Sequence, residues 1–363
     1  MNNRKRRLLR PLFWLLCLWL VFGSAGCAPV RENNDSGKPY EDTRLTAWFI
    51  DVGQADATLF ESDGHYMLVD GGEPETAEEL IDYMRDAGAE KLDYLLLTHP
   101  HEDHDGAAPE VLRAFETETV ILPRISGWET EFAPVLEAVD SEDMLEFAAA
   151  GESYELGEAQ FTVVSPDDPD YGDDWNDWSV GIRLWCGDTS FLLYGDGTAR
   201  MELDMLETGE EIQSDVLKVA HHGSSTSSSD RLLKAVQPKY AVISCGRGNS
   251  YGHPGALALE RLAQAGAAVF RTDEQGTVIA YSDGAGIRWS TEPSTSGKPG
   301  TIIVDKEDES SEGDYILNAN TKKFHSPSCS SVKDMNRENR KEFRGTREEL
   351  IKDGYSPCGR CKP

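Results

Sequence analysis

The eight residues HPHEDHDG at 99–106 constrain this chain of 363 residues more than any other feature. They hold three of its eight histidines and follow the apolar run LDYLLLT (92–98), which is typical of a buried strand. Neutral imidazoles are ligands for zinc and other transition metals, and a carboxylate adds a harder donor. A solvated polar loop is the alternative. Donors packed this densely at the end of a buried strand predict a metal site.

Two further strand-like runs end in candidate ligands. Asp196 follows SFLLYG (190–195), and His221 and His222 follow DVLKVA (215–220). A single Gly-Asp pair is weak evidence, because such pairs usually mark turns. Donors at three strand ends in one chain are stronger together, and they are expected to meet in one site.

Short apolar runs alternate with helical patterns from Leu45 onward. Strands are expected within 45–51, 56–60, 66–70, 92–98, 119–122, 161–164, 179–185, 190–195, 215–220, 240–244, 268–272 and 277–282. Helices fit 75–87, 107–115, 198–207, 228–236 and 256–265. This order suggests two sheets packed face to face and covered by helices, although it also allows a single Rossmann-like sheet.

The motifs carry a resemblance to a known family. HPHEDHDG is similar to the HxHxDH signature of the metallo-β-lactamase superfamily. Within it, the chain most resembles the hydrolase domain of the ComEC competence proteins, in the segments FIDVGQADATLF (49–60), LLTHPHEDHDG (96–106), NDWSVGIRL (176–184), LLYGDGT (192–198), LKVAHHGSSTSSS (217–229) and GNSYGHP (248–254). The resemblance implies an α/β fold, an αββα sandwich, for a hydrolase domain over 44–290.

The resemblance also implies a two-metal site, with two Zn (or Mn) ions held by His99, His101, Asp103, His104, Asp196 and His222. The first two histidines would bind the first metal, Asp103 and His104 the second, and Asp196 would bridge them. His222 is the favoured last ligand, and the neighbouring His221 is the alternative. Many relatives have a further histidine before the bridging aspartate, whereas this chain has Asn176, Asp177 and Ser179 there. The first metal is therefore expected to have fewer protein ligands.

Two cations at this spacing can activate a water molecule and clamp a phosphoryl group. Asp103, His221 and His253 are the candidate catalytic residues, and His253 would hold the phosphate or protonate the leaving oxygen, unless it is a structural turn residue. Residues expected beside the metals or the substrate are Asp51, Gln54, Asn176, Ser179 and Ser224. Asp51 would orient a ligand imidazole or simply end a strand. The run SSTSSS (224–229) would bind phosphate or cap a helix.

The first 26 residues are expected to be a signal peptide. A basic start precedes the apolar run at 11–23, which is too short to span a membrane. The end of this segment, SAGC (24–27), resembles a bacterial lipobox with Cys27 as the lipidation site, and residues 27–43 have the composition of a tether. Cleavage without lipid or an uncleaved anchor are the alternatives. We therefore expect an extracytoplasmic protein, as a membrane-anchored lipoprotein or in secreted form.

The formal net charge of −30 is unevenly distributed. Residues 27–313 have 19 Lys and Arg residues against 58 Asp and Glu residues, a net charge of −39, whereas residues 314–363 have 11 against 7, a net charge of +4. The acidic body argues against a protein that coats nucleic acid or anionic membrane with its whole surface. No apolar run after residue 30 reaches the about 20 residues of a spanning helix, so we expect no transmembrane channel.

Residues 291–313 have linker composition, and residues 314–363 have the spacing of a zinc module. His325, Cys329, Cys358 and Cys361 can supply four tetrahedral ligands, and about fifty residues have little core of their own. The segments FHSPSC and YSPCGRC resemble the metal-binding domain of the Ada DNA-repair proteins, with His325 in place of a cysteine. The resemblance implies one structural Zn and contact with DNA phosphates. A disulfide is the alternative.

These expectations combine into an exported binuclear metal-dependent hydrolase with a small C-terminal zinc-stabilised domain. Its expected substrate is a phosphodiester, with extracellular DNA as the first candidate. One alternative is a phosphoesterase acting on cell-wall or choline-type phosphodiesters. The other is a lipoprotein that captures DNA without cleaving it.

Overall fold

The computed structural model describes residues 40–167, 171–172, 174–301, 313–327, 329, 331–358 and 361. The predicted signal peptide, Cys27, most of the tether and residues 302–312 of the predicted linker lie outside these ranges. Residues 40–301 form the body, and residues 313–361 form the tail.

An eight-stranded sheet of the body has the strand order β15-β14-β1-β2-β3-β4-β5-β6. Its strands are β1 (Leu45–Phe49), β2 (Thr58–Ser62), β3 (His65–Val69), β4 (Lys91–Leu96), β5 (Glu116–Leu122), β6 (Leu145–Phe147), β14 (Val278–Ser282) and β15 (Ile287–Trp289). Strands β3 to β6 pair in parallel. Their carboxyl ends therefore meet at one edge of the sheet.

A seven-stranded sheet has the order β13-β12-β11-β10-β9-β8-β7. Its strands are β7 (Ser153–Leu156), β8 (Ala159–Ser165), β9 (Gly181–Cys186), β10 (Thr189–Leu193), β11 (Val216–Lys218), β12 (Tyr240–Ile243) and β13 (Ala268–Arg271). Strands β10 to β13 are parallel. This sheet therefore also has an edge at which several carboxyl ends meet.

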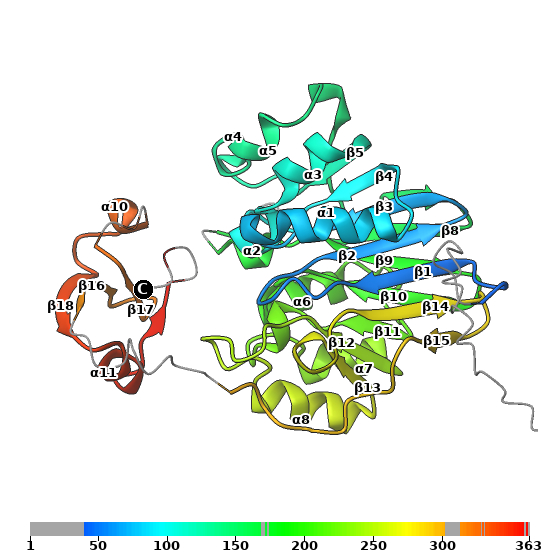
Figure 1. Ribbon diagram of the computed structural model, residues 1–363. Helices are drawn as coiled ribbons and strands as arrows, with labels where there is room; N and C mark the ends of the chain where they lie inside the picture. The colour runs from blue at the N-terminus through cyan, green and yellow to red at the C-terminus, as the bar shows by residue number, and fades with distance from the viewer. Residues whose placement is uncertain are drawn as a thin grey trace, which may run out of the picture. The chain divides into compact units, whose positions relative to one another are not determined.

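The two sheets pack face to face, and helices cover their outer faces (Figure 1). Leu45 and Phe49 of β1 belong to a buried cluster with Phe191 of β10, whereas Trp48 points to the other face and packs in a cluster with Leu80 of a helix. The alternation follows from the two-residue period of a strand. The predicted αββα sandwich is confirmed, and the Rossmann-like alternative is wrong.

The longer helices of the body are α1 (Ala77–Asp86), α3 (Ala108–Ala114), α6 (Ala199–Glu207), α7 (Asp230–Val236) and α8 (Ala256–Ala265). Shorter turns of helix are η1 (Pro74–Thr76), α2 (Glu102–Asp105), α4 (Trp128–Glu131), α5 (Ala133–Leu136), η2 (Glu142–Met144), η3 (Trp175–Trp178), η4 (His221–Gly223) and α9 (Thr272–Gln275). Each predicted helix has a counterpart among the longer ones.

Every predicted strand range contains a strand, and three strands of the body, β6, β7 and β15, were not predicted. All three lie at sheet edges. Their residues are mostly exposed or half-buried, unlike the fully buried β1, β2 and β10. An edge strand has one free side and is not required to bury a continuous apolar run, so its sequence pattern is weak.

The tail forms a four-stranded sheet of order β18-β16-β17-β19. Its elements are β16 (Gly313–Asn318), β17 (Lys323–His325), α10 (Ser331–Asp334), β18 (Arg340–Gly345), α11 (Arg347–Lys352) and β19 (Ser356–Pro357). Thr346 and Glu349 form a capping box at the start of α11. The apolar clusters of the tail are small, and the buried members of one of them are Leu317, Phe324 and Leu350. Among the described residues, no helix has the length and apolar character required to cross a membrane.

Candidate metal centre

The candidate ligands of the body come together at the carboxyl ends of parallel strands. The segment with His99, His101, Asp103 and His104 follows β4, Asp196 follows β10, and His222 follows β11. His99, His104, Asp196 and His222 are at most 3% exposed. Residues separated by more than 100 positions thus share one buried site, as the strand-end pattern predicted.

Four donors lie around one point. His104 Nε2 is 3.2 Å from Asp196 Oδ1, and His222 Nε2 is 3.7 Å from the same oxygen. His222 Nε2 is also 3.4 Å from Asp103 Oδ2. Two imidazoles and two carboxylates at these separations match the preferred donors of a zinc or manganese ion. They correspond to the ligand set expected for the second metal.

Hydrogen bonds orient both imidazoles of this set. His104 Nδ1 donates to Asp70 Oδ2 at 2.8 Å, and His222 Nδ1 donates to the carbonyl oxygen of Ser244 at 3.1 Å. Asp70 is itself fixed by Thr98, whose N–H and hydroxyl donate to its two carboxylate oxygens. With both Nδ1 atoms protonated, both Nε2 lone pairs face the carboxylates, which is the tautomer that metal binding requires.

Three of these donor atoms are buried without a hydrogen-bond partner among the described residues: His104 Nε2, Asp196 Oδ1 and His222 Nε2. Buried polar atoms are nearly always hydrogen-bonded. Three buried ligand atoms that face one another without such a bond therefore require another explanation. A cation bound between them would satisfy all three. The residues present therefore fit a metal ion.

The electrostatics of the set also favour a positive charge. Burial opposes protonation of His104 and His222, but Asp196 and Asp70 raise the pKa of His104 well above its usual value, and Asp196 and Asp56 raise the pKa of His222 to about 10. Burial would raise the pKa of Asp196, but the surrounding imidazoles hold it well below its usual value. A proton and a metal ion compete for the same lone pairs, so a cation is electrostatically favoured here.

Of the ligands expected for the first metal, His99 has its ring centroid 4.2 Å from that of His104. His99 Nε2 is 2.8 Å from His101 Nδ1, and burial lowers the pKa of His99 well below its usual value and that of His101 to about 4. Both rings are thus neutral, as metal ligands must be. Ser179 is one of the residues that this chain has in the segment where many relatives have a further histidine. Its hydroxyl lies 3.4 Å from His99 Nδ1. The same hydroxyl accepts the Asp196 N–H at 3.2 Å.

One contact and the exposure of the side chain distinguish His221 from His222. His221 Nε2 lies 3.6 Å from Asp196 Oδ2, the oxygen opposite to the one that faces His104 and His222, and its side chain is 25% exposed. The geometry therefore favours His222 as the last ligand of the second metal. His221 lies at the other oxygen of the Asp196 carboxylate and lines the cleft.

Sequence reasoning missed a buried ion pair beside the ligands. Lys218 Nζ lies 2.7 Å from Asp56 Oδ2, and the side chains are 3% and 5% exposed. Asp56 Oδ1 in turn lies 3.3 Å from His222 Nδ1. Burial would raise the pKa of Asp56, but Lys218 and His222 outweigh this and lower it to about 2. The lysine in the otherwise apolar run VLKVA (216–220) was the available indication of a buried partner.

The role of orienting an imidazole falls on Asp70 rather than on Asp51. Asp51 is exposed, and its Oδ1 accepts the Gly53 N–H at 3.3 Å, as in a residue that ends a strand. Asp70 ends the predicted strand at 66–70, so the strand-end pattern that identified the ligands would also have identified this residue.

Asn176 Oδ1 is buried without a hydrogen-bond partner among the described residues, and Asn176 lines the cleft.

The serine-rich segment after His222 forms hydrogen bonds with other groups of the body. The N–H groups of Ser228 and Ser229 donate to the buried carboxylate of Glu202, and the Ser229 hydroxyl caps α7. Ser224 is buried, and its hydroxyl bonds Thr226. These contacts agree with the helix-capping alternative for Ser228 and Ser229.

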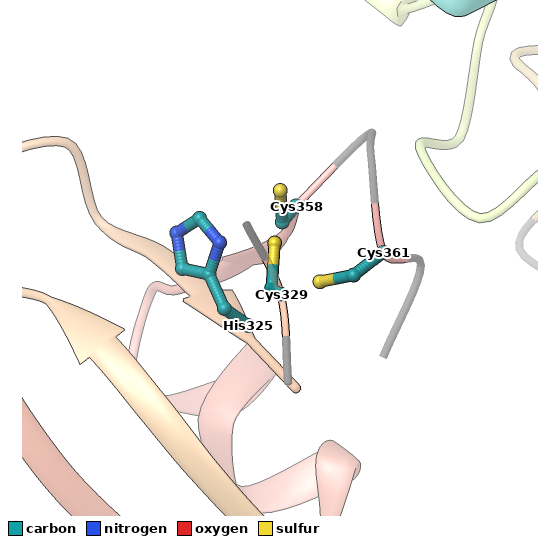
Figure 2. Close-up of side chains that lie close together, drawn as sticks. All are labelled: His325, Cys329, Cys358 and Cys361. Carbon is teal, nitrogen blue, oxygen red and sulfur yellow. The ribbon is translucent and has the colours of Figure 1, made fainter. Parts of the chain in front are cut away.

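The tail contains a second cluster. Ligand atoms of His325, Cys329, Cys358 and Cys361 lie within 4.8 Å of one another, and Figure 2 shows the four side chains converging. No described cysteine forms a disulfide, and His325 Nδ1 is buried without a hydrogen-bond partner among the described residues. Burial raises the pKa of the Cys361 thiol to about 12. The donor set is compatible with a metal-binding module.

Comparisons with known proteins agree with the site. A family model described as the Metallo-beta-lactamase superfamily matches residues 50–247. The chain is 32% identical to ComE operon protein 3 of Bacillus subtilis over 63% of this chain and 32% of that protein. It is 34% identical to Recombination protein 2 of Haemophilus influenzae (63% and 28% covered) and 29% identical to Competence protein ComA of Neisseria gonorrhoeae (72% and 35% covered).

The chain therefore spans about a third of the length of these curated relatives. The matched segment contains β4, β10 and β11 with the donors that follow them. Members of this family are generally metal-dependent hydrolases, in agreement with a buried set of unpartnered imidazole and carboxylate donors. This chain belongs to the metallo-β-lactamase superfamily.

Proposed function

We propose that the body is a binuclear metal-dependent phosphodiesterase. The observation that carries this proposal is the position of the Asp196 carboxylate, which has His104 and His222 at one oxygen and His221 at the other. When bound, two cations would polarise a phosphoryl group and lower the pKa of a water molecule. His99, His101 and Asp196 would hold the first cation, and Asp103, His104, Asp196 and His222 the second.

DNA is the first substrate to test. Relatives of this chain carry the names of competence and recombination proteins, and the tail has a net charge of +4. In the tail, Arg340, Lys341 and Arg344 of β18 are exposed on an edge strand. Such a basic edge would contact phosphates and add a salt-dependent attraction.

A second candidate is a small phosphodiester, such as a cell-wall or choline-type compound. The cleft beside the ligands is lined by many more acidic than basic side chains of the body, among them Glu73, Glu79, Glu102, Asp105, Glu110 and Glu131, with Arg113. A long polyanion would be repelled along such a surface, whereas a short or cationic diester would not. A protein that captures DNA without cleaving it is the third candidate.

The test is hydrolysis by the full chain loaded with Zn or Mn. The substrates are plasmid DNA, single-stranded DNA and bis(4-nitrophenyl) phosphate. Cleavage of all three supports the nuclease, whereas cleavage of the small diester alone supports the second candidate. Asp103→Ala should abolish cleavage, and Asp93→Asn, which changes a carboxylate that bonds His65, is the matched control. Binding of DNA without any hydrolysis would leave only the capture protein.

The proposed site of action is outside the cytoplasmic membrane, with a lipid on Cys27 as the anchor. This part of the proposal rests on the N-terminal sequence, which lies outside the described residues. Labelling of cells with a radioactive or alkynyl fatty acid should mark the full chain and not the Cys27→Ala variant. Equal labelling of both would contradict lipidation, and a protein found only in the cytoplasm would contradict export.

A further inference from the structure

The loop between β12 and α8 carries His253 and is built around one asparagine. Asn249 is 8% exposed, and its Oδ1 accepts the His253 N–H at 3.0 Å. Its Nδ2 donates to the carbonyl oxygens of His253 at 2.6 Å and of Gly246 at 2.9 Å. The backbone of His253 is thus fixed from both sides, which positions the imidazole at the cleft.

Gln54 fixes the ring itself. The N–H of Gly246 donates to Gln54 Oε1 at 3.0 Å, and this bond determines which end of the amide is the oxygen. The other end, Nε2, lies 3.4 Å from His253 Nδ1. A Cβ added at Gly246 would lie 2.8 Å from the Gln54 backbone nitrogen, so the two segments are in close contact.

An amide nitrogen can only donate, and His253 Nδ1 must therefore accept. A ring nitrogen that accepts a hydrogen bond carries no proton, so the proton of the neutral ring is on Nε2. We propose that Gln54 is a positioning residue that holds His253 as the neutral, Nε2-protonated imidazole. This deepens the proposed function and rests on it where the substrate is concerned.

This tautomer restricts the role that His253 can have in the reaction. A neutral imidazole that gave up its Nε2 proton would become an imidazolate, which is far too basic to form at neutral pH. His253 therefore offers a hydrogen bond to a phosphoryl oxygen and keeps its proton. Of the two roles expected from the sequence, holding the phosphate remains, and protonation of the leaving oxygen does not.

The neighbouring rings support a donor rather than an acid. The His253 ring is stacked on Tyr251, with centroids 5.6 Å apart and planes at 23°, and its centroid is 5.9 Å from that of His221. The ring is held between these neighbours and the Gln54 amide, so its Nε2–H direction is set before a substrate binds. Pre-organised donors of this kind stabilise charge that develops on an oxygen.

The decisive experiment is two-bond ¹H–¹⁵N correlation NMR of the zinc-loaded full chain labelled at histidine. The His253→Gln variant assigns the His253 resonances. We expect an unprotonated Nδ1 and a protonated Nε2 in the wild type, and a protonated Nδ1 in Gln54→Glu, because a carboxylate at this place can only accept. Gln264→Glu, on the exposed face of α8, is the matched control and should leave the pattern unchanged.

A protonated Nδ1 in the wild type, or an unchanged pattern in Gln54→Glu, would overturn the proposal. This measurement needs no turnover, so the tautomer of His253 can be determined even if no phosphodiester is cleaved and the proposed function fails. With an active enzyme, Gln54→Glu should lower kcat about 10- to 100-fold with little change in KM. The loss in His253→Ala should be the same for aryl phosphodiesters with good and poor leaving groups, whereas a larger loss with the poor ones would show a general acid.

Discussion

His104 Nδ1 lies 2.8 Å from Asp70 Oδ2, and both side chains are almost fully buried. This pair orients the imidazole whose other nitrogen faces Asp103 and Asp196. Asp70→Ala should therefore weaken metal binding at the second site by about 10- to 100-fold, which competition with a chromogenic chelator would measure.

The chain offers a matched control for this variant. His65 Nδ1 lies 2.7 Å from Asp93 Oδ1 on the same sheet, but this pair is not part of the candidate site. Asp93→Ala should leave the metal affinity unchanged. Equal affinities in the Asp70→Ala variant and the wild type would contradict the orienting role.

The two charges of the buried Lys218–Asp56 pair should depend on each other for stability in the metal-free body. Removal of one member leaves the other charge buried without a counter-charge, so Lys218→Met should lower the free energy of unfolding by about 3–5 kcal/mol. The double variant Asp56→Leu, Lys218→Met should recover most of this loss. Urea unfolding of the chelated protein measures both, and additive losses in the double variant would show that the two charges are not coupled.

The same pair predicts a dependence of stability on pH. The pKa of Asp56 is about 2 in the folded protein, below the ordinary value of 3.8. A lowered pKa stabilises the fold at pH values above the ordinary one, and this contribution is lost as the pH falls from about 4 through 2. Over that interval the chelated wild type should lose about 2 kcal/mol more than the Asp56→Leu, Lys218→Met variant. Parallel unfolding curves for the two proteins would argue against the shift.

Metal removal should separate the tail from the body. Cys358→Ser removes one of four converging ligands, so the zinc content should fall by one ion per chain and the tail should lose its folded NMR signals. The metals of the body and its hydrolytic activity should be unaffected. The control is Cys186→Ala, a buried thiol of β9 that is not in the cluster. A tail that keeps its signals in Cys358→Ser, or after chelation, would contradict a structural zinc ion.

Much of the fold could be predicted because its strands are buried on both faces. Runs such as 94–97 and 191–194 are apolar throughout, since they lie between a second sheet and a layer of helices. The edge strands β6, β7 and β15 were not predicted, because partial exposure removes the need for such a pattern.

The candidate ligands could be predicted for a related reason. Parallel strands bring their carboxyl ends to one edge, so polar residues directly after apolar runs indicate a shared site even when they are 100 residues apart. His99, Asp196 and His222 all follow this rule. The spacing of three cysteines and one histidine in the tail likewise indicated the second cluster.

Only the tertiary structure decided which atoms face each other. The choice between His221 and His222, the pairing of Asp70 with His104, and the buried contact of Lys218 with Asp56 depend on side-chain directions at loop positions. Linear spacing carries no information on such directions. The sequence by itself determined the donor types and the strands that present them, because these follow from local chemistry and burial. The protonation states and the partners were set by packing between segments distant in the chain.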